Sequence, residues 1–169
     1  MLVLVGLACF GCSGAGSKTE PLNPPPQRPA VEMTLPQLGG GTHSIQQHRG
    51  HPVVITLFTT WCLRCQAEAP LFVRLHETQR RLRVVGVALD DLTKLSLVQT
   101  YVQFVGFQFP VLLAEPNNLD LVGGLGATPQ VPRTVLLDPA GRVAQDHVGQ
   151  TDFPRLERGI KRVLGREKR

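Results

Sequence analysis

Two short apolar runs, separated by a segment with helical spacing, constrain the fold of this chain most strongly. Val53–Phe58 and Val84–Leu89 are rich in β-branched residues and almost continuously apolar. Such runs are typical of strands that are covered on both faces. The segment between them, 62–81, has apolar residues at helical spacing and contains Pro70, where we expect a kink. The sequence therefore predicts a strand–helix–strand unit at the centre of an α/β fold.

The pattern on either side extends this central unit. We expect a short strand at 31–35 and, after a glycine-rich turn at 39–41, a return strand that starts at Ser44 and Ile45. The downstream pattern predicts helices at 92–105 and 119–125, strands at 110–113 and 134–137, and a hairpin partner for the last strand at 142–148. A last helix is expected to have its apolar face on Phe153, Leu156, Ile160 and Val163 or Leu164. This order predicts a three-layer α/β/α sandwich with parallel central strands and an antiparallel edge.

The first 30 residues differ in composition from the rest. Residues 1–12 are almost wholly apolar and look like the core of a secretory signal. Cys12, or alternatively Cys9, resembles the lipid-attachment cysteine of a bacterial lipobox, and residues 13–30 have the Gly, Ser and Pro content of an extended tether. We therefore expect a leader at 1–12, a tether at 13–30 and one folded domain at 31–169, anchored by lipid to a membrane in the cell envelope.

The formal net charge of +5 comes from one end of the chain. Residues 155–169 hold seven basic and two acidic side chains, and the other residues hold 11 of each sign. A solvated C-terminal helix accounts for this run of charge. A basic groove with stacking aromatic residues is missing from the sequence, so we expect no nucleic-acid partner.

The chemistry of the chain concentrates in Trp61-Cys62-Leu63-Arg64-Cys65, directly after the first apolar run. Two cysteines three residues apart can form half of a zinc site, lie buried without a role, or act as a redox pair. The five histidines are scattered and offer no matching zinc pair, so we expect no metal and no cofactor. At the first turn of a helix, Cys62 would have a lowered pKa and would act as the attacking thiolate. Cys65, about one turn further along, would then be the resolving thiol.

Two segments together resemble the TlpA/ResA-like branch of thioredoxin-fold proteins. They are PVVITLFTTWCLRCQAEAP, around the cysteine pair, and QVPRTVLLDPAGRV, about 65 residues downstream. The resemblance implies a thioredoxin-like fold with an N-terminal β-hairpin and a central βα insertion. It also implies that Pro132 is a cis-proline and that the backbone of Val131 binds substrate beside the cysteines, with Trp61 and Arg64 on the same substrate-binding surface.

The resemblance also implies a role for Glu68, which matches the acidic residue of the pattern C-x-x-E-x-P. As a partly buried carboxylate, Glu68 could hold or relay the proton of Cys65. Thr56 stands where thioredoxin has a buried acid in the preceding strand. Between the cysteines, Leu63-Arg64 lacks the usual proline, and the charge of Arg64 should stabilise the Cys62 thiolate, which leaves the direction of electron flow open.

The functional hypothesis is an envelope thiol–disulfide oxidoreductase that acts on exported proteins, as a reductant of the cytochrome c maturation type. Its partners would be disulfide-containing or dithiol proteins, a membrane redox donor and the membrane surface. Two alternatives remain open. Thr59-x-x-Cys62 fits part of a peroxiredoxin pattern, although Ile55 replaces its proline. The cysteine pair could also bind a soft metal in a copper-delivery domain.

Overall fold

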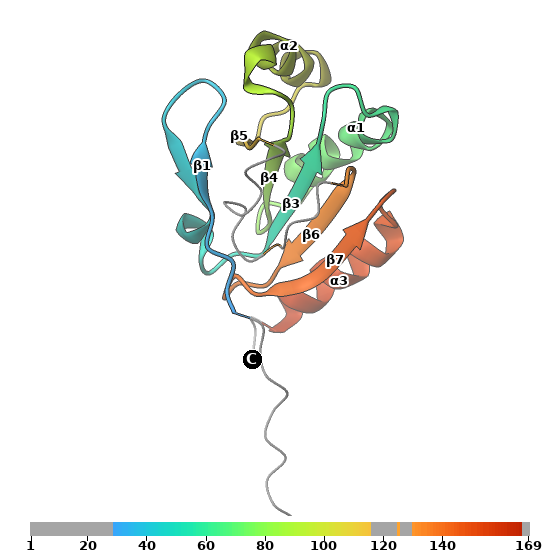
Figure 1. Ribbon diagram of the computed structural model, residues 1–169. Helices are drawn as coiled ribbons and strands as arrows, with labels where there is room; N and C mark the ends of the chain where they lie inside the picture. The colour runs from blue at the N-terminus through green and yellow to red at the C-terminus, as the bar shows by residue number, and fades with distance from the viewer. Residues whose placement is uncertain (1–28, 116–124, 126–129, 167–169) are drawn as a thin grey trace, which may run out of the picture.

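The computed structural model describes residues 29–115, 125 and 130–166. Its main feature is a five-stranded sheet with the strand order β5-β4-β3-β6-β7 (Figure 1). The sheet consists of β3 (Val53–Phe58), β4 (Arg83–Ala88), β5 (Val111–Leu113), β6 (Arg133–Leu137) and β7 (Val143–Val148). A separate antiparallel hairpin is formed by β1 (Thr34–Pro36) and β2 (Thr42–Ser44). The helices are η1 (Ile45–His48), α1 (Leu63–Thr78), η2 (Leu92–Lys94), α2 (Leu95–Val105) and α3 (Phe153–Arg166).

The central strands have the predicted directions. β3 pairs in parallel with β4, and β4 pairs in parallel with β5. β6 lies antiparallel to β3, and β7 lies antiparallel to β6 as its hairpin partner. Every residue of β3 is buried, which agrees with its continuous apolar composition. The predicted parallel centre and antiparallel edge are therefore confirmed.

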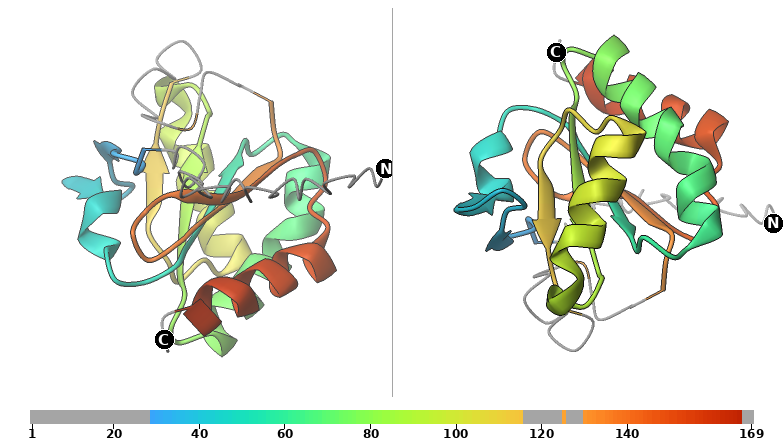
Figure 2. Two further views of the ribbon diagram at one scale, coloured as in Figure 1. Left: turned by 90° about the horizontal axis from the view of Figure 1, so that it is seen from below. Right: turned by 90° about the horizontal axis from the view of Figure 1, so that it is seen from above.

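Two apolar clusters cover the two faces of the sheet. α1, α2 and α3 pack on one face, where Phe72, Val98 and Ile160 belong to the same cluster. The other face is covered by the N-terminal segment and η1, through residues such as Met33 and Ile45, and by Leu125. Figure 2 shows the three α-helices on one side of the sheet and the β1–β2 hairpin on the other. The mixed α/β prediction is confirmed, whereas the short helix expected at 119–125 lies outside the described residues except for Leu125.

Several predicted boundaries were wrong, and the strand expected at 31–35 is β1 at Thr34–Pro36. The return strand ends at Ser44 instead of starting there, because Gly39, Gly40 and Gly41 all adopt positive φ and turn the chain directly into Thr42. Ile45 instead begins η1 and is fully buried, with its backbone N–H donating to the carbonyl of Met33. The helix expected to reach residue 81 ends at Thr78, where the N–H of Gln79 caps the carbonyl of Leu75.

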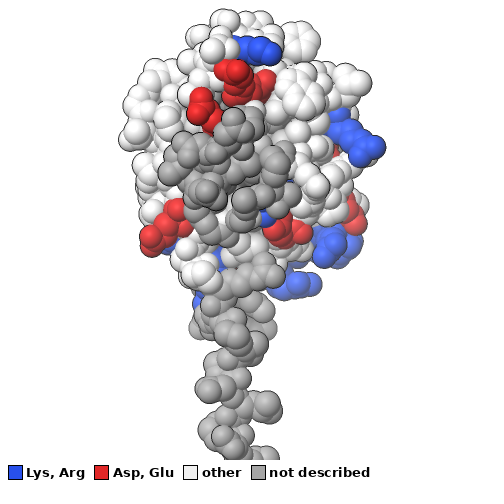
Figure 3. All heavy atoms as spheres, viewed as in Figure 1, with Lys and Arg blue, Asp and Glu red and all other residues white. Residues whose placement is uncertain are grey.

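On the face shown in Figure 3, basic and acidic side chains are interspersed, and the described residues there form no continuous basic surface. In the part of the chain that is described, none of the helices combines the length and the apolar composition needed to cross a bilayer. The leader, with Cys12, and residues 13–28 of the predicted tether lie outside the described residues, whereas Ala30 forms an antiparallel bridge with Arg142.

Candidate active site

The cysteine pair lies where β3 leaves the sheet and α1 begins. Cys62 is the N-cap residue of α1, and Leu63 is its first helical residue. Buried Asp90, just past the end of β4, fixes the preceding loop, because its carboxylate accepts hydrogen bonds from the backbone N–H and the hydroxyl of Thr60. The parallel pairing of β3 and β4 brings both strand ends to the same edge. Asp90 therefore anchors the loop that carries Trp61 and Cys62.

The two cysteines form a disulfide, with their Cα atoms 5.2 Å apart. The backbone N–H of Cys65 donates a hydrogen bond of 3.2 Å to Sγ of Cys62. A sulfur that accepts such a bond at a helix N-terminus is stabilised as an anion, by the bond and by the helix dipole. Cys62 is 9% exposed and Cys65 is 4% exposed. Sγ of Cys62 is therefore the better leaving group when the disulfide is broken, and the Cys62 thiolate is the better nucleophile when the pair is reduced.

The residues around Cys62 present an apolar surface to solvent. Trp61 is 70% exposed and Leu63 is 78% exposed, although both are large hydrophobic residues. Arg64 is also exposed, one position before Cys65. Trp61 and Arg64, two predicted substrate-binding residues, are thus both exposed next to the cysteines in the chain, and their binding role stays a prediction.

The predicted cis-proline is present. The Val131–Pro132 peptide bond is cis, and Pro132 is buried at the start of β6. Val131 is half-buried and packs against the same apolar cluster as Cys62 and Cys65. The sheet therefore brings the two sequence motifs together, although they are far apart along the chain.

Glu68 lies one turn beyond Cys65 and is 2% exposed, so it is not a surface carboxylate. One carboxylate oxygen of Glu68 accepts a hydrogen bond from the backbone N–H of Thr151, and the other accepts one from the Thr151 hydroxyl. The Thr151 hydroxyl lies 2.8 Å from the hydroxyl of buried Thr134. Thr134 in turn pairs across β6 and β3 with Thr56, where thioredoxin would have its buried acid. Glu68 thus belongs to a buried cluster of polar side chains, with Thr151 and Thr134, between α1 and the sheet.

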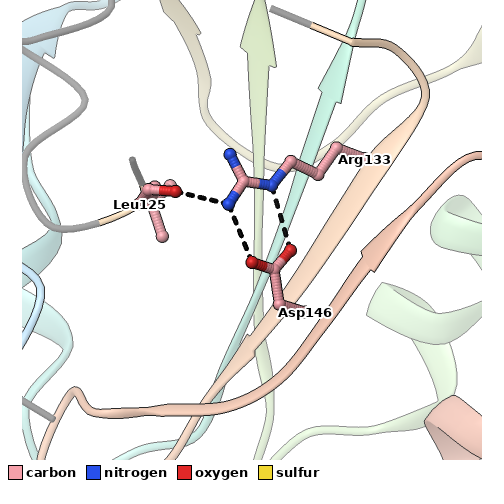
Figure 4. Close-up of polar contacts among 3 residues, drawn as sticks. All are labelled: Leu125, Arg133 and Asp146. Atoms are coloured by element: carbon pink, nitrogen blue, oxygen red, sulfur yellow. Dashed lines mark hydrogen bonds and ion pairs between the residues drawn. The ribbon is translucent and has the colours of Figure 1, made fainter. Parts of the chain in front are cut away.

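The strand that follows the cis-proline also contains an ion pair that the sequence analysis missed. Arg133, directly after Pro132, is buried in β6 and donates through Nε and Nη2 to the carboxylate of Asp146 in β7 (Figure 4). Its Nη2 also donates to the carbonyl of Leu125 (Figure 4). The sequence did contain a signal for this ion pair, which is a basic residue next to the apolar residues of a predicted buried strand. A buried cation requires a partner of opposite charge. Arg133 thus links the strand after the cis-proline to Leu125.

Metal ligands do not gather in the described part of the chain. No group of three or more His, Cys, Asp or Glu side chains there is arranged to hold a metal ion.

Nε2 of His43 and Nε2 of His48 are 2.9 Å apart, as in a hydrogen bond between two rings. Burial lowers the pKa of His48 to about 4, with further lowering by His43, Arg83 and His51. This histidine pair therefore favours the neutral state in the folded protein.

Comparisons with known proteins agree with this geometry. The model of the AhpC/TSA family matches residues 26–146. Thiol-disulfide oxidoreductase ResA of Bacillus thuringiensis is 27% identical over 135 residues, which are 79% of this chain and 76% of that protein. The ResA protein of Bacillus cereus is 27% identical over 165 residues, or 96% and 92% of the two chains. A thiol:disulfide interchange protein of the thioredoxin family from Chlorobium tepidum superimposes with a TM-score of 0.70 at 26% identity, covering 82% of this chain and 97% of that one. The predicted thioredoxin fold and the resemblance to ResA are confirmed.

Proposed function

The chain belongs to the AhpC/TSA family, and from this membership and the Cys62–Cys65 disulfide we propose that it is a thiol–disulfide oxidoreductase. The disulfide at the N-terminus of α1 is the observation that carries the proposal. Relatives named thiol-disulfide oxidoreductase and a thioredoxin-family neighbour support it. The proposed direction is reduction of disulfides in exported proteins, as in cytochrome c maturation.

In the proposed reaction the protein begins with both cysteines reduced. The Cys62 thiolate attacks one sulfur of the substrate disulfide, and the other substrate sulfur leaves as a thiolate. This step forms a mixed disulfide between Cys62 and the substrate. The Cys65 thiolate then attacks Sγ of Cys62, which releases the second substrate thiol and forms the Cys62–Cys65 disulfide. Two electrons pass to the substrate, and a dithiol donor at the membrane restores the reduced pair.

The buried position of Glu68 suits a role in the second step. Cys65 must lose its proton before it can attack, and Glu68 lies one helical turn from it, at 2% exposure. We propose that Glu68 accepts this proton, while Thr151 holds the carboxylate in place through its N–H and hydroxyl. Val131 would present its backbone to the bound substrate chain beside the cysteines.

The proposed location is the cell envelope, with Cys12 as the lipid-attachment residue and 13–30 as the tether. The apolar run at 1–12 and the Gly, Ser and Pro content of 13–30 support this proposal. Radioactive fatty-acid labelling of the full chain in a bacterial host tests it. Label that is lost in Cys12→Ser and kept in Cys9→Ser would support Cys12, and label that is kept in Cys12→Ser would contradict it.

The equilibrium potential of the Cys62–Cys65 pair against glutathione tests the direction. A reductant should have a potential near that of thioredoxin, about −270 mV. A value near that of DsbA, about −120 mV, would overturn the reductant role. Rapid peroxide turnover by the Cys65→Ser variant would support the peroxidase alternative, because a peroxidatic Cys62 would not need Cys65. Metal analysis of the reduced protein separates the copper-delivery alternative.

A further inference from the structure

Helix α2 packs on the sheet with one face, and the face that it leaves to solvent carries no charged side chain. Exposed helices normally place charged and polar residues on their solvent face. From residue 95 to residue 114 the chain has no Asp, Glu, Lys or Arg. Within α2 only Val98 is buried, whereas Leu97 is 49% exposed and Phe104 is 88% exposed. α2 therefore presents an uncharged surface to solvent, on which Leu97 and Phe104 lie among neutral polar residues such as Gln99 and Gln103.

A groove between α2 and the first half of α1 extends this surface as far as Trp61, the residue before Cys62. The groove has a volume of about 590 Å³. Trp61 and Pro70 line it from the active-site side, and Leu97, Tyr101 and Phe104 line it from α2. Its polar lining consists of neutral groups, such as Gln66 and Thr100. Trp61 directly precedes Cys62, so one end of the groove is formed by the residue next to the reactive cysteine in the chain.

A contiguous exposed apolar surface next to a reactive group is typical of a binding site. We propose that the groove between α1 and α2 binds apolar side chains of the polypeptide whose disulfide is exchanged at Cys62, an inference that rests on the proposed function. The uncharged lining favours an apolar segment over an acidic or basic one. Exposed aromatic residues such as Trp61 and Phe104 are the groups that contribute most to interfaces. A second copy of the chain seated on this surface would cover the approach to Cys62.

The test compares the rates at which two synthetic peptides exchange disulfides with the full-length reduced protein. Each peptide has one intramolecular disulfide, and the two differ only in their flanking residues, which are Leu and Phe in one and Ser and Gln in the other. Exchange transfers two electrons from the Cys62 and Cys65 thiols to the peptide, which breaks the peptide disulfide and forms the protein disulfide. We expect the apolar peptide to react about tenfold faster at low concentration, since burial of one large apolar side chain supplies at least this factor.

The variant Phe104→Gln tests whether α2 provides this preference. Phe104 is almost fully exposed, so its replacement should leave folding intact. We expect this variant to lose most of the preference for the apolar peptide. The matched control is Leu71→Gln, which replaces another exposed apolar residue, 40% exposed, on α1 outside the groove lining. The control should keep the full preference. Trp61 is the only tryptophan, so its fluorescence should shift with the apolar peptide in the wild type and less in Phe104→Gln.

The outcomes separate the docking surface from the proposed function. Equal rates with both peptides in the wild type would overturn the docking surface and leave the oxidoreductase function standing. An unchanged preference in Phe104→Gln would also overturn it. If Phe104→Gln converted a dimer into a monomer while the preference stayed the same, a second copy would be the occupant and the proposal would be wrong. Failure of both peptides to exchange would overturn the proposed function and the docking surface together.

Discussion

The backbone N–H of Cys65 donates to Sγ of Cys62 across 3.2 Å, so the first turn of α1 stabilises negative charge on one of the two sulfurs. After reduction, this bond favours the Cys62 thiolate. A hydrogen bond to a charged group contributes about 1.5–3 kcal/mol, which corresponds to a factor of ten or more. We therefore expect Cys62 to react with iodoacetamide at neutral pH about tenfold faster than Cys65. Mass spectrometry of proteolytic fragments measures the ratio, and faster alkylation of Cys65 would reverse the two roles.

Glu68→Gln should slow disulfide exchange by about 10²-fold at neutral pH, because a positioned proton acceptor contributes on this scale. Stopped-flow rates across a pH series measure the effect, and the pH profile distinguishes a proton-transfer role from a purely structural one. Glu77→Gln is the control, because Glu77 is an exposed carboxylate on the same helix. A pH profile in Glu68→Gln that matches the wild type would remove Glu68 from the mechanism.

The ion pair between Arg133 and Asp146 predicts an asymmetric response to substitution. The Arg133 side chain is 4% exposed, and the Asp146 side chain is 31% exposed. Asp146→Ala removes a carboxylate that accepts two hydrogen bonds from a buried cation and should lower the free energy of unfolding by about 1.5–3 kcal/mol. Arg133→Met removes the cation, retains an apolar stem and leaves a carboxylate that water can reach. Urea unfolding should therefore show the smaller loss for Arg133→Met, and the reverse order would contradict this account of the pair.

The pair of His43 and His48 predicts a loss of stability in acid. The folded state lowers the pKa of His48 from 6.5 to about 4, mainly by burial, so the folded protein disfavours the charged ring. Unfolding then takes up a proton between these pH values, and stability should fall as the pH drops from 6.5 to about 4. Urea unfolding of the wild type and of His48→Gln measures the difference. The variant should lose part of this pH dependence, whereas His147→Gln should retain it.

The local parts of the site could be predicted from the sequence. The apolar composition of Val53–Phe58 gave a buried strand, and the cysteine spacing placed Cys62 at the first turn of the following helix. The cis bond before Pro132 followed from a resemblance between motifs, because an isolated proline in a strand does not specify its isomer. These features depend on neighbouring residues in the chain or on a short motif.

The contacts between distant segments could not be predicted in this way. Glu68 and Thr151 are 83 residues apart, and their hydrogen bonds depend on how α1 packs against the loop before α3. Asp90 binds Thr60 because two parallel strands end at the same edge, which the sequence shows only after the register is known. Similarly, the apolar residues of α2 fit a helix with a buried face, but the structure leaves Leu97 and Phe104 exposed in a groove that Trp61 also lines.

Covalent trapping tests the proposed exchange reaction most directly. The reduced full chain of Cys65→Ala is mixed with a protein that contains one disulfide, and the adduct is located by mass spectrometry after proteolysis, which distinguishes Cys62 from Cys9 and Cys12. We predict a stable mixed disulfide on Cys62, because the thiol that would resolve it is missing. In the Cys62→Ala variant we predict no mixed disulfide on Cys65. Absence of an adduct on Cys62, or an adduct on Cys65 in Cys62→Ala, would contradict the proposed mechanism.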